Sequence, residues 1–530
     1  MSPVIRPRGL EERCRRGLAA ADALVNRLVG WRFNPLYQSG TIVIALLLIL
    51  LVTGIWLLLF YRVGAPWASV ARITEDPWLG NWVRGVHRYA SDAAVIAAVV
   101  HLLRVFAQAR SWGPRVLAWV SGVLLLGMLL VSGWTGFVMV WDVFGQLLAL
   151  EGARLLDALP ILSEPVGRTF AGDRVIPDAF FFVNLFLHVV VPLGMGLGLW
   201  IHVSRVARPT LLPPRGLLWT LTALLIGAAL LRPLAMAPEA SPFALPAEVP
   251  LDWFYAFWLP LGRGMPEAAA WGLAAGVTLA LLLAPRWTRR GADDRAPASE
   301  VNPDLCTGCT QCSLDCPWEA ITMVSRTDGR AELLAQVDPK LCVSCGICAG
   351  SCAPMGIGPP GRTGRDQLAA MRAWMAAPDR RAAEPVVIAC EYGPGGGAER
   401  AGRDGRLQAS GTALYRVPCA GNLHTSVIEY AIRAGAGGVL VLACPPRDCL
   451  NREGPRWLNE RVYHDREAEL QARVDRRRVA IGHAGLGDRS AARETIAEFR
   501  DRIQALEAIA AEPEVVLDTE CEPVPVEEKT

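Results

Sequence analysis

Two runs of four cysteines, each with the spacing C-x2-C-x2-C-x3-C, constrain this 530-residue chain more than any other feature. The first run is Cys306, Cys309, Cys312 and Cys316, and the second is Cys342, Cys345, Cys348 and Cys352. The repeated spacing is typical of proteins that hold two 4Fe–4S clusters, each with three thiolates from one run and a fourth from the other. We therefore expect one cluster on Cys306, Cys309, Cys312 and Cys352, and a second on Cys342, Cys345, Cys348 and Cys316. A disulfide-rich or zinc module is the alternative, but zinc sites seldom use eight sulfurs at this spacing.

The N-terminal half of the chain has the composition of a membrane protein. The run from Thr41 to Phe60 carries no charge and is long enough to cross a bilayer core of ~30 Å. Five further spans are predicted at Tyr89–Phe106, Val116–Trp141, Ala179–Val203, Leu217–Leu231 and Ala268–Pro285. The sequence thus predicts an N-terminal segment over residues 1–40 and a membrane domain of about six helices over 41–285.

Charge and cysteine chemistry predict which side of the membrane the ends of the chain occupy. Seven arginines precede the first span, so the positive-inside rule places both ends of a six-span protein in the cytoplasm. Eight reduced thiolates also belong in a reducing compartment. We expect a multi-pass protein of the cell (inner) membrane with cytoplasmic iron–sulfur domains. The net charge of +2 and the lack of a basic stripe give no indication of a nucleic-acid partner.

Four of the seven histidines fall in or beside two predicted spans. His87 and His101 lie on one span and His188 and His202 on another, and each pair is separated by 14 positions. Fourteen steps of ~100° return a side chain to within ~40° of its starting direction, about 21 Å further along the helix. Two such helices can hold two stacked hemes, each between a histidine from either helix. A single histidine of this kind could be a packed core residue, but ionisable residues inside a bilayer are usually functional.

Two glycine pairs repeat the same spacing of 14 residues. Gly40 directly precedes the first predicted span and Gly54 lies within it, and Gly122 and Gly136 lie in the third. Glycine lets a flat macrocycle approach the helix backbone closely because it has no side chain. Helix packing is the alternative role, since glycine is common in membrane helices.

Residues 31–260 resemble cytochrome b, the diheme subunit of quinol–cytochrome c oxidoreductases. The resemblance rests on Asn34-Pro35-Leu36, Thr53-Gly54-Ile55, Arg84 before His87, Gly133-Trp134-Thr135-Gly136-Phe137 and His188…Pro192…His202. It implies that His87 and His188 bind the heme near the outer face, and that His101 and His202 bind the heme near the cytoplasm. It also implies that Arg84, Arg104 and Arg115 neutralise heme propionates; interface anchoring is the alternative. A homodimer is a further implication of the family.

The family's quinol-oxidation site carries an acidic residue in a Pro-Glu-Trp-Tyr element. The corresponding stretch here runs from Val249 to Tyr255, and Asp252 stands where the family has its proton-accepting glutamate. The proline is displaced by one position, and a helix cap is the alternative role for Asp252. The stretch 36–39 has no cysteine and Cys14 lies too far upstream, so no covalent heme is predicted.

The C-terminal half reads as three further segments. Residues 286–300 form a polar linker, residues 301–360 a ferredoxin-like module, and residues 365–510 an α/β domain, followed by an acidic tail over 511–530 with one surface cysteine, Cys521. Strands alternating with helices predict a parallel sheet covered by helices. The predicted strands are Val386–Ala389, Tyr415–Pro418, Gly438–Ala443 and Val479–Gly482, and the predicted helices are His424–Arg433 and Ser490–Ala510. A cysteine follows each of the first three strands, at the edge where ligands gather.

Residues 384–510 resemble the delta subunit of methyl-viologen-reducing hydrogenase. The resemblance rests on Pro418-Cys419-Ala420-Gly421, the stretch 434–439, Ala443-Cys444-Pro445-Pro446-Arg447-Asp448-Cys449 and Arg452-Glu453-Gly454. It implies a 2Fe–2S cluster held by Cys390, Cys419, Cys444 and Cys449. A metal-free α/β domain is the alternative. The glycine stretch 393–397 lacks the strand and helix context of a dinucleotide site, so we expect any flavin or nicotinamide to belong to a partner.

Every predicted module moves electrons, in an expected order of hemes, two 4Fe–4S clusters and then a 2Fe–2S cluster at the cytoplasmic surface. The sequence predicts a membrane-anchored electron-transfer protein, a subunit of a quinone-linked oxidoreductase. It would link the quinone pool to a cytoplasmic flavoprotein or iron–sulfur oxidoreductase, such as a heterodisulfide reductase-like, hydrogenase or NAD(P)H enzyme. Inward electron flow opposes the membrane potential, which slightly favours quinone reduction over quinol oxidation. A redox-sensing or assembly scaffold is the alternative function.

Overall fold

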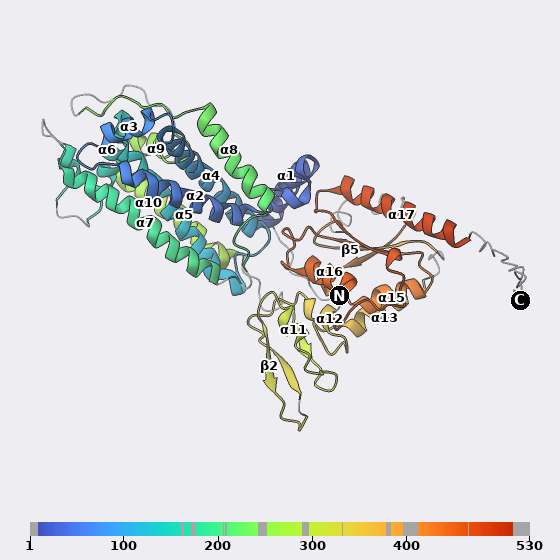
Figure 1. The fold of residues 1–530 in the computed structure, drawn as a ribbon. Helices are drawn as coiled ribbons and strands as arrows, with labels where there is room; N and C mark the ends of the chain where they lie inside the picture. Colours follow the sequence, from blue (N-terminus) through green and yellow to red (C-terminus); the bar gives the residue numbers. More distant parts are fainter. Residues whose placement is uncertain are drawn as a thin grey trace, which may run out of the picture.

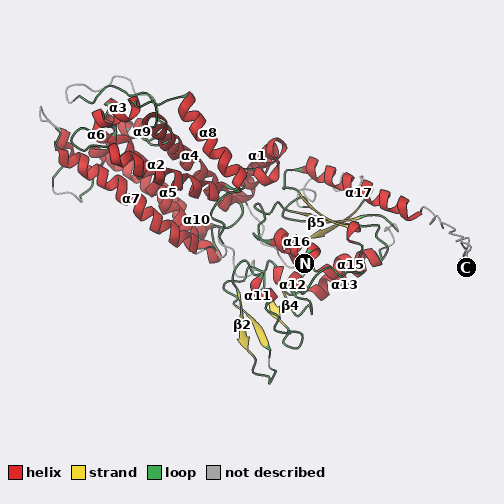
Figure 2. Ribbon diagram, viewed as in Figure 1, coloured by secondary structure: helices red, strands yellow, loops and turns green. Residues whose placement is uncertain are grey.

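The computed structural model describes residues 9–160, 164–170, 176–204, 206, 209–241, 252–288, 296–330, 332–377, 383–395, 412–464 and 466–511. A long bundle of helices formed by the N-terminal half lies beside two smaller folded units formed by the C-terminal half (Figure 1). The unit that carries β2 (Ile321–Ser325) is strand-containing, and the unit that carries β5 (Val386–Cys390) contains a sheet flanked by helices (Figure 2).

Among the residues that the structure describes, five helices are long and apolar enough to cross a membrane. They are α2 (Ser39–Phe60), α4 (Gly80–Ala107), α5 (Val116–Met139), α7 (Asp178–Ser204) and α10 (Glu267–Trp287). The fifth predicted span, Leu217–Leu231, corresponds to a shorter apolar helix, α8 (Arg215–Leu231). Large apolar side chains such as Leu59, Trp200 and Leu231 point outward from these helices, as expected where a helix bundle faces lipid rather than water.

Small residues allow the helices of the bundle to approach each other closely. Helix α2 packs along α4, α5 packs along α7, and α8 covers another face of α4. Ala90 and Ala94 of α4 are fully buried, and a Cβ atom added to Gly85 would lie 2.8 Å from the Cβ of Ala229 on α8. Such contacts are typical of membrane helices, where close packing replaces the hydrophobic effect between helices.

Four further helices of the N-terminal half connect or flank the spans. They are α1 (Gly9–Phe33), α3 (Pro66–Glu75), α6 (Val143–Asp157) and α9 (Leu259–Gly264). Helix α1 lies between the bundle and the C-terminal domain (Figure 1). Its Asn26 donates a hydrogen bond to Asp488 at 3.2 Å, and the ring of Trp31 lies 4.8 Å from that of His483. The N-terminal segment therefore has an ordered, structural role that the sequence did not reveal.

The ferredoxin-like module contains two small antiparallel sheets and two short helices. Strand β1 (Glu300–Val301) pairs with β4 (Ile357–Gly358), and β2 pairs with β3 (Leu333–Val337). Helices α11 (Gln311–Leu314) and α12 (Ile347–Ser351) each begin inside one of the cysteine runs. Gly308 and Gly346 adopt φ values of 70° and 78°, which allow the cysteine loops to turn back on themselves.

The C-terminal domain has the parallel sheet that the sequence predicted, and its strand order is β6-β5-β7-β8. Its strands are β5, β6 (Ala413–Val417), β7 (Val439–Ala443) and β8 (Val479–His483). Strands β5 and β7 are apolar along their whole length because both of their faces are buried. Helix α17 (Arg489–Ala511) packs on one face through Ile496, Phe499 and Ile503.

The other face of this sheet is covered mainly by α15 and α16. These helices are α15 (Thr425–Arg433) and α16 (Gly454–Tyr463), and α13 (Gly364–Met375) packs against α15. The sequence analysis predicted α15 and α17 but missed α16. Residues 289–295 of the predicted linker, the end of the glycine stretch from Gly396 and residues 512–530 of the acidic tail, with Cys521, lie outside the described residues.

Candidate redox centres

The four membrane histidines meet in pairs across the bundle. His87 of α4 and His188 of α7 face each other with their ring centroids 6.4 Å apart. A nitrogen of each ring would lie roughly 2 Å from a shared metal, and each ring centroid lies about 1 Å behind that nitrogen. These lengths add up to about the observed separation of the two ring centroids. His101 lies within electrostatic range of His202 further along the same two helices. The arrangement fits the two heme positions implied by the sequence.

The four paired glycines lie directly against the four histidine rings. A Cβ atom added to Gly40 would lie 2.8 Å from His101, and one added to Gly54 would lie 3.2 Å from His87. The corresponding distances are 3.3 Å from Gly122 to His202 and 2.7 Å from Gly136 to His188. The missing side chain of each glycine thus makes room for the imidazole ring. The sequence analysis had instead expected these glycines to make room for the heme macrocycle.

Hydroxyl groups orient three of the four imidazoles. Thr53 lies 2.9 Å from Nδ1 of His87, Ser121 lies 2.9 Å from Nδ1 of His202, and Thr135 lies 3.1 Å from Nδ1 of His188. Fixing Nδ1 leaves Nε2 directed toward a metal, which is how ligating histidines are commonly held. Sequence reasoning missed these residues, although each hydroxyl directly precedes the glycine at its histidine.

The arginines expected at heme propionates already have partners within the protein. Arg84 donates to Thr74 at 3.0 Å and to the carbonyl of Leu234 at 3.3 Å. Arg104 pairs with Asp22 and with Asp448, and Arg115 stacks over the ring of Trp318 at 4.3 Å. Arg104 and Arg115 therefore join the membrane domain to the soluble part of the chain.

Asp252 has the geometry of a cap. Its carboxylate accepts hydrogen bonds from the amides of Phe254 at 3.0 Å and Tyr255 at 2.6 Å, and pairs with Arg88. Burial acts to raise the pKa of Asp252, but the Tyr255 amide and the Arg88 charge outweigh it, so the pKa lies below its usual range. The sequence analysis weighed Asp252 as a helix cap, whereas it caps a turn that precedes α9, whose N-cap is Trp258. A low pKa makes Asp252 a poor proton acceptor.

A second carboxylate, Asp92, lies beside Asp252 and was missed. Arg88 bridges the two acids, with its Nε 3.4 Å from Asp92 Oδ2. The other carboxylate oxygen, Oδ1 of Asp92, is buried and has no hydrogen-bond partner among the described residues. Its signal was present in the sequence, because Asp92 is the one acidic residue in the predicted span 89–106.

The ring of Tyr255 fills the space beside Gly133, where a Cβ would overlap it.

Four cysteines of the ferredoxin-like module line one cavity. They are Cys306, Cys309, Cys312 and Cys352, the same four that spacing assigned to one cluster. Burial raises the pKa of the Cys312 thiol, and the other sulfurs of this cavity act in the same direction. Crowded, buried thiols of this kind suit a metal cluster, because metal binding removes their protons and disperses their charge.

The other four cysteines of this module also gather together. Burial raises the pKa of the Cys348 thiol to about 12, and Cys342 and Cys316 are among its neighbours. Cys345 is half-buried and lies beside Cys348 and Cys316. The set is therefore the second one that spacing predicted. It also lies close to Cys419 of the C-terminal domain.

The four C-terminal cysteines converge at one edge of the parallel sheet. The sulfurs of Cys390 and Cys444 are 3.6 Å apart, and hydrogen bonds from Cys390 and Cys449 lower the pKa of Cys419. A Cβ atom added to Gly454 would lie 3.2 Å from the sulfur of Cys419 and 3.4 Å from that of Cys449, so a larger residue would crowd them. Residues near these strand ends thus form one site, as the sequence predicted for a parallel sheet.

The cysteines do not form a disulfide framework. None of the thirteen described cysteines takes part in a disulfide bond. Within the described part of the chain, no group of three or more His, Cys, Asp or Glu side chains has the spacing of a site for a single metal ion. Cluster ligands are distributed over several irons, so they lie further apart than the ligands of a single ion.

Three family models match the chain in succession. Residues 24–208 match cytochrome b/b6/petB, residues 305–356 match the 4Fe-4S dicluster domain, and residues 386–507 match the delta subunit of methyl-viologen-reducing hydrogenase. A relative, the menaquinol:cytochrome c reductase cytochrome b subunit of Geobacillus thermodenitrificans, is 26% identical over 176 residues, which are 32% of this chain and 79% of the relative. A chain of a solved hyperthermophilic respiratory Complex III matches with 18% identity and a TM-score of 0.40, covering 49% of this chain and 78% of the other.

The three family models and the five apolar helices of the described residues define the chain first as a multi-pass membrane protein built from redox domains. More particularly, a cytochrome b domain is followed by a 4Fe–4S dicluster domain and then by a domain of the methyl-viologen-reducing hydrogenase delta subunit family. The resemblances drawn from the sequence are confirmed, and so is the multidomain fold with a helical membrane bundle and a parallel sheet.

Proposed function

We propose that the chain carries electrons between the membrane quinone pool and a soluble oxidoreductase in the cytoplasm. Two b hemes would be held by His87 with His188 and by His101 with His202. Two 4Fe–4S clusters and one 2Fe–2S cluster would occupy the three cysteine sets. The domain division at residues 41–285, 301–360 and 365–510, with both ends cytoplasmic, is part of the proposal.

One observation carries the proposal: the histidine pairs of the bundle and the three cysteine sets belong to parts of one chain that are in direct contact. Arg104, three residues beyond His101, pairs with Asp448, which directly precedes Cys449. Centres held at these positions would form a continuous series from the bilayer to the aqueous domains. The name of the Geobacillus relative, a menaquinol:cytochrome c reductase subunit, supports a quinol or quinone as the membrane substrate.

Quinone reduction is the slightly favoured direction. Moving an electron inward against a potential that is negative inside costs about 2.3 kcal/mol per 100 mV. Outward flow from a low-potential cytoplasmic donor avoids that cost. The match to a hydrogenase delta subunit supports a cytoplasmic flavoprotein or iron–sulfur oxidoreductase as the soluble partner.

The experiment is electron transfer in proteoliposomes that contain the full-length chain and menaquinone. Reduced methyl viologen is added as a soluble donor, and quinone reduction is followed by absorbance. We expect rapid quinone reduction that His101→Leu abolishes and that the control His464→Leu, at an exposed histidine, leaves intact. Unimpaired quinone reduction in His101→Leu, or purified protein without b-type heme absorbance, would refute the proposal. A sensor or assembly scaffold would show reducible centres without quinone turnover.

A further inference from the structure

The end of helix α4 is fixed to the loop that carries Cys449. Arg104 Nη2 lies 2.8 Å from Asp448 Oδ1, and Gln108 Nε2 donates to the same oxygen at 3.0 Å. Arg110, just beyond the helix, donates to the carbonyl of Leu450 at 2.8 Å and also to that of Cys449. His101 lies only three residues before Arg104, which is about 4.5 Å along a helix. The inner histidine pair is therefore close to a ligand of the C-terminal cysteine set.

This contact is buried and held from several sides. The side chains of Arg104 and Asp22 are each only 7% exposed, and they form a two-pronged pair at 3.0 and 2.9 Å. The ring of Tyr37 lies against the Arg104 guanidinium at 4.6 Å. Paired, planar contacts of this type fix orientation as well as adding free energy. The C-terminal domain is thus docked on the bundle in one defined position.

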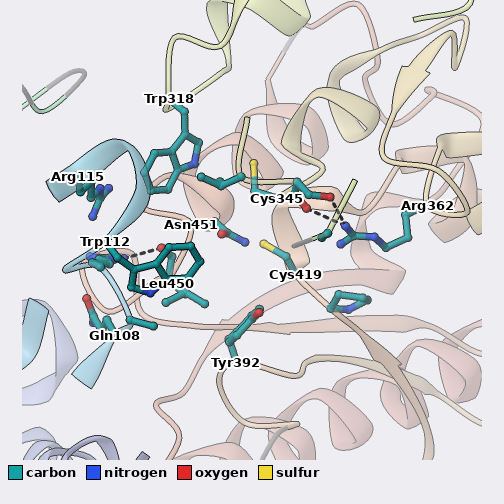
Figure 3. Close-up of a pocket in the computed structure, with 16 residues that line it drawn as sticks. Gln108, Trp112, Arg115, Trp318, Cys345, Arg362, Tyr392, Cys419, Leu450 and Asn451 are labelled. Carbon is teal, nitrogen blue, oxygen red and sulfur yellow. Dashed lines mark hydrogen bonds between the residues drawn. The ribbon is translucent and has the colours of Figure 1, made fainter. Parts of the chain in front are cut away.

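The C-terminal cysteine set also adjoins one set of the ferredoxin-like module. Cys419 and Cys345 line the same pocket, together with Arg110, Arg115 and Arg362 (Figure 3). No acidic side chain lines it among the described residues, so the arginines can balance the negative charge of thiolate clusters on either side. Asn422, three residues after Cys419, donates to the carbonyl of Gly346 at 2.9 Å, which follows Cys345 directly.

The cavity of Cys306, Cys309, Cys312 and Cys352 lies apart from the membrane domain. All of the described residues that line it belong to the stretch 301–357 of the module itself. Gly308 in this cavity packs against Leu333 of β3, and the hairpin of β2 and β3 projects away from the bundle and from the parallel sheet (Figure 2). Contacts lead from the membrane histidines to the Cys449 loop, then from Cys419 to Cys345, and only then to this cavity. The set of Cys306, Cys309, Cys312 and Cys352 is therefore the furthest from the membrane histidines.

We propose that the C-terminal cysteine set is the inner relay, between the inner heme and the ferredoxin-like module. The order would be His101/His202, then Cys390/Cys419/Cys444/Cys449, then Cys316/Cys342/Cys345/Cys348, and last Cys306/Cys309/Cys312/Cys352, where the soluble partner exchanges electrons. This differs from the order expected from the sequence, in which the 2Fe–2S cluster came last, at the cytoplasmic surface. The inference rests on the proposed function. Each step passes one electron, oxidising the donor centre and reducing the acceptor centre by one unit, with no proton transferred and no bond broken.

A direct route from the membrane domain to the ferredoxin-like module is the competing possibility. Arg115 stacks over Trp318, two residues after Cys316, at 4.3 Å. However, Arg115 lies seven residues from Gly122 at the inner histidine pair, whereas Arg104 lies three residues from His101. The Cys449 loop also receives an ion pair and several hydrogen bonds from α4 and the residues after it, which favours the route through the C-terminal set.

Cys419→Ser tests the order in the purified full-length chain. The protein is mixed without oxygen with the methyl viologen radical cation, which gives up one electron per molecule. Heme reduction is followed by absorbance and the 4Fe–4S signals by low-temperature EPR. We expect wild type and the control Cys14→Ser to reduce their hemes in a fast phase. Cys419→Ser should reduce its 4Fe–4S clusters but lose that fast phase. A Cys309→Ser/Cys345→Ser double variant gives the rate of direct dye-to-heme reaction.

A fast heme phase in Cys419→Ser with intact 4Fe–4S signals would overturn the proposed order while leaving the proposed function standing. No fast phase in wild type would instead refute the proposed function. If Cys419→Ser fails to assemble its clusters, Asp448→Asn decides, because it weakens the junction without removing a sulfur. We expect Asp448→Asn to keep every cluster signal and potential yet slow heme reduction roughly tenfold or more. Unchanged heme reduction, as expected for the control Asp475→Asn, would overturn the order.

Discussion

Arg461 of α16 donates a hydrogen bond to the hydroxyl of Ser351 on α12, with 3.0 Å between Nη1 and Oγ. The same guanidinium donates to the carbonyls of Gly421 at 2.7 Å and Ile347 at 3.3 Å, and its side chain is almost completely buried. A Cβ at Gly350 would lie 2.4 Å from it. One buried arginine thus connects the ferredoxin-like module to the C-terminal domain.

Replacing this arginine should destabilise the soluble part of the chain. Arg461→Ala removes the guanidinium donor from the buried Gly421 carbonyl and the buried Ser351 hydroxyl, at roughly 1–3 kcal/mol each, whereas the Ile347 carbonyl still accepts from Ser351 Oγ. A total of ~3 kcal/mol corresponds to a fall of about 6–12 °C in the unfolding midpoint of a domain of this size. Circular dichroism of the cluster-loaded protein measures the midpoint. The control Arg477→Ala removes an exposed arginine paired with Asp475 and should change it little. Equal midpoints for the two variants would contradict the role given to Arg461.

The glycines beside the histidines should decide heme content one site at a time. A Cβ at Gly136 would lie 2.7 Å from His188, so Gly136→Val should displace that ring and prevent binding of the outer heme only. Gly127, on the same helix, has open space around it, so Gly127→Val is the matched control. Reduced-minus-oxidised spectra with a redox titration should show one heme in Gly136→Val and two in the control. Two normal hemes in Gly136→Val would show that the contact is not required.

Much of this architecture could be predicted from the sequence, because the relevant signals are local or periodic. Uncharged apolar runs locate helices such as α2, and the all-apolar segments of β5 and β7 locate the central strands. Cysteine spacing predicted the grouping of Cys352 with Cys306, which the cavity reproduces. These features depend only on residues that are close in the sequence or repeated at a fixed interval.

The contacts between domains could not be predicted in the same way. The Arg104–Asp448 pair joins residues 344 positions apart, and nothing in either local sequence specifies the partner. A positive charge at the end of a span can neutralise a heme propionate, anchor the helix at the membrane surface or pair with another domain. The sequence does not distinguish these roles, so Arg104 was interpreted as a propionate ligand. Helix α16 was missed because it starts with glycine and proline and because its two arginines and other polar residues leave it few apolar positions. The position of the C-terminal domain, and so the order of the centres, follows from such contacts alone.

Alanine variants of the ferredoxin-like cysteines should fall into two groups that cross the sequence runs. Cys352→Ala should leave the same residual EPR spectrum as Cys309→Ala, because both sulfurs line one cavity. Cys316→Ala and Cys348→Ala should share the other residual spectrum, and Cys14→Ala should match wild type. Each variant of the two groups should also lose one cluster's iron on quantitation. A Cys352→Ala spectrum that instead matched that of Cys348→Ala would mean that each run binds its own cluster.

Asp92, rather than Asp252, should carry the proton in quinone chemistry. The Asp252 carboxylate is committed to two backbone amides and Arg88, which keep its pKa low, whereas Oδ1 of Asp92 is buried with no hydrogen-bond partner among the described residues. Positioned general acids or bases contribute typically ~10²–10⁴-fold to rate. We therefore expect Asp92→Asn to slow quinone reduction in proteoliposomes about 100-fold with both hemes still present.

Asp252→Asn is the matched comparison, because asparagine can still cap the turn before α9. Asparagine and aspartate are similarly good caps, so this variant should fold normally and lose less than about tenfold in rate. Heme reduction by methyl viologen should be unchanged in both variants, since that step transfers no proton. The opposite ranking, with Asp252→Asn the slower enzyme, would assign the proton to the residue at the family's glutamate position and leave Asp92 with a structural role at Arg88.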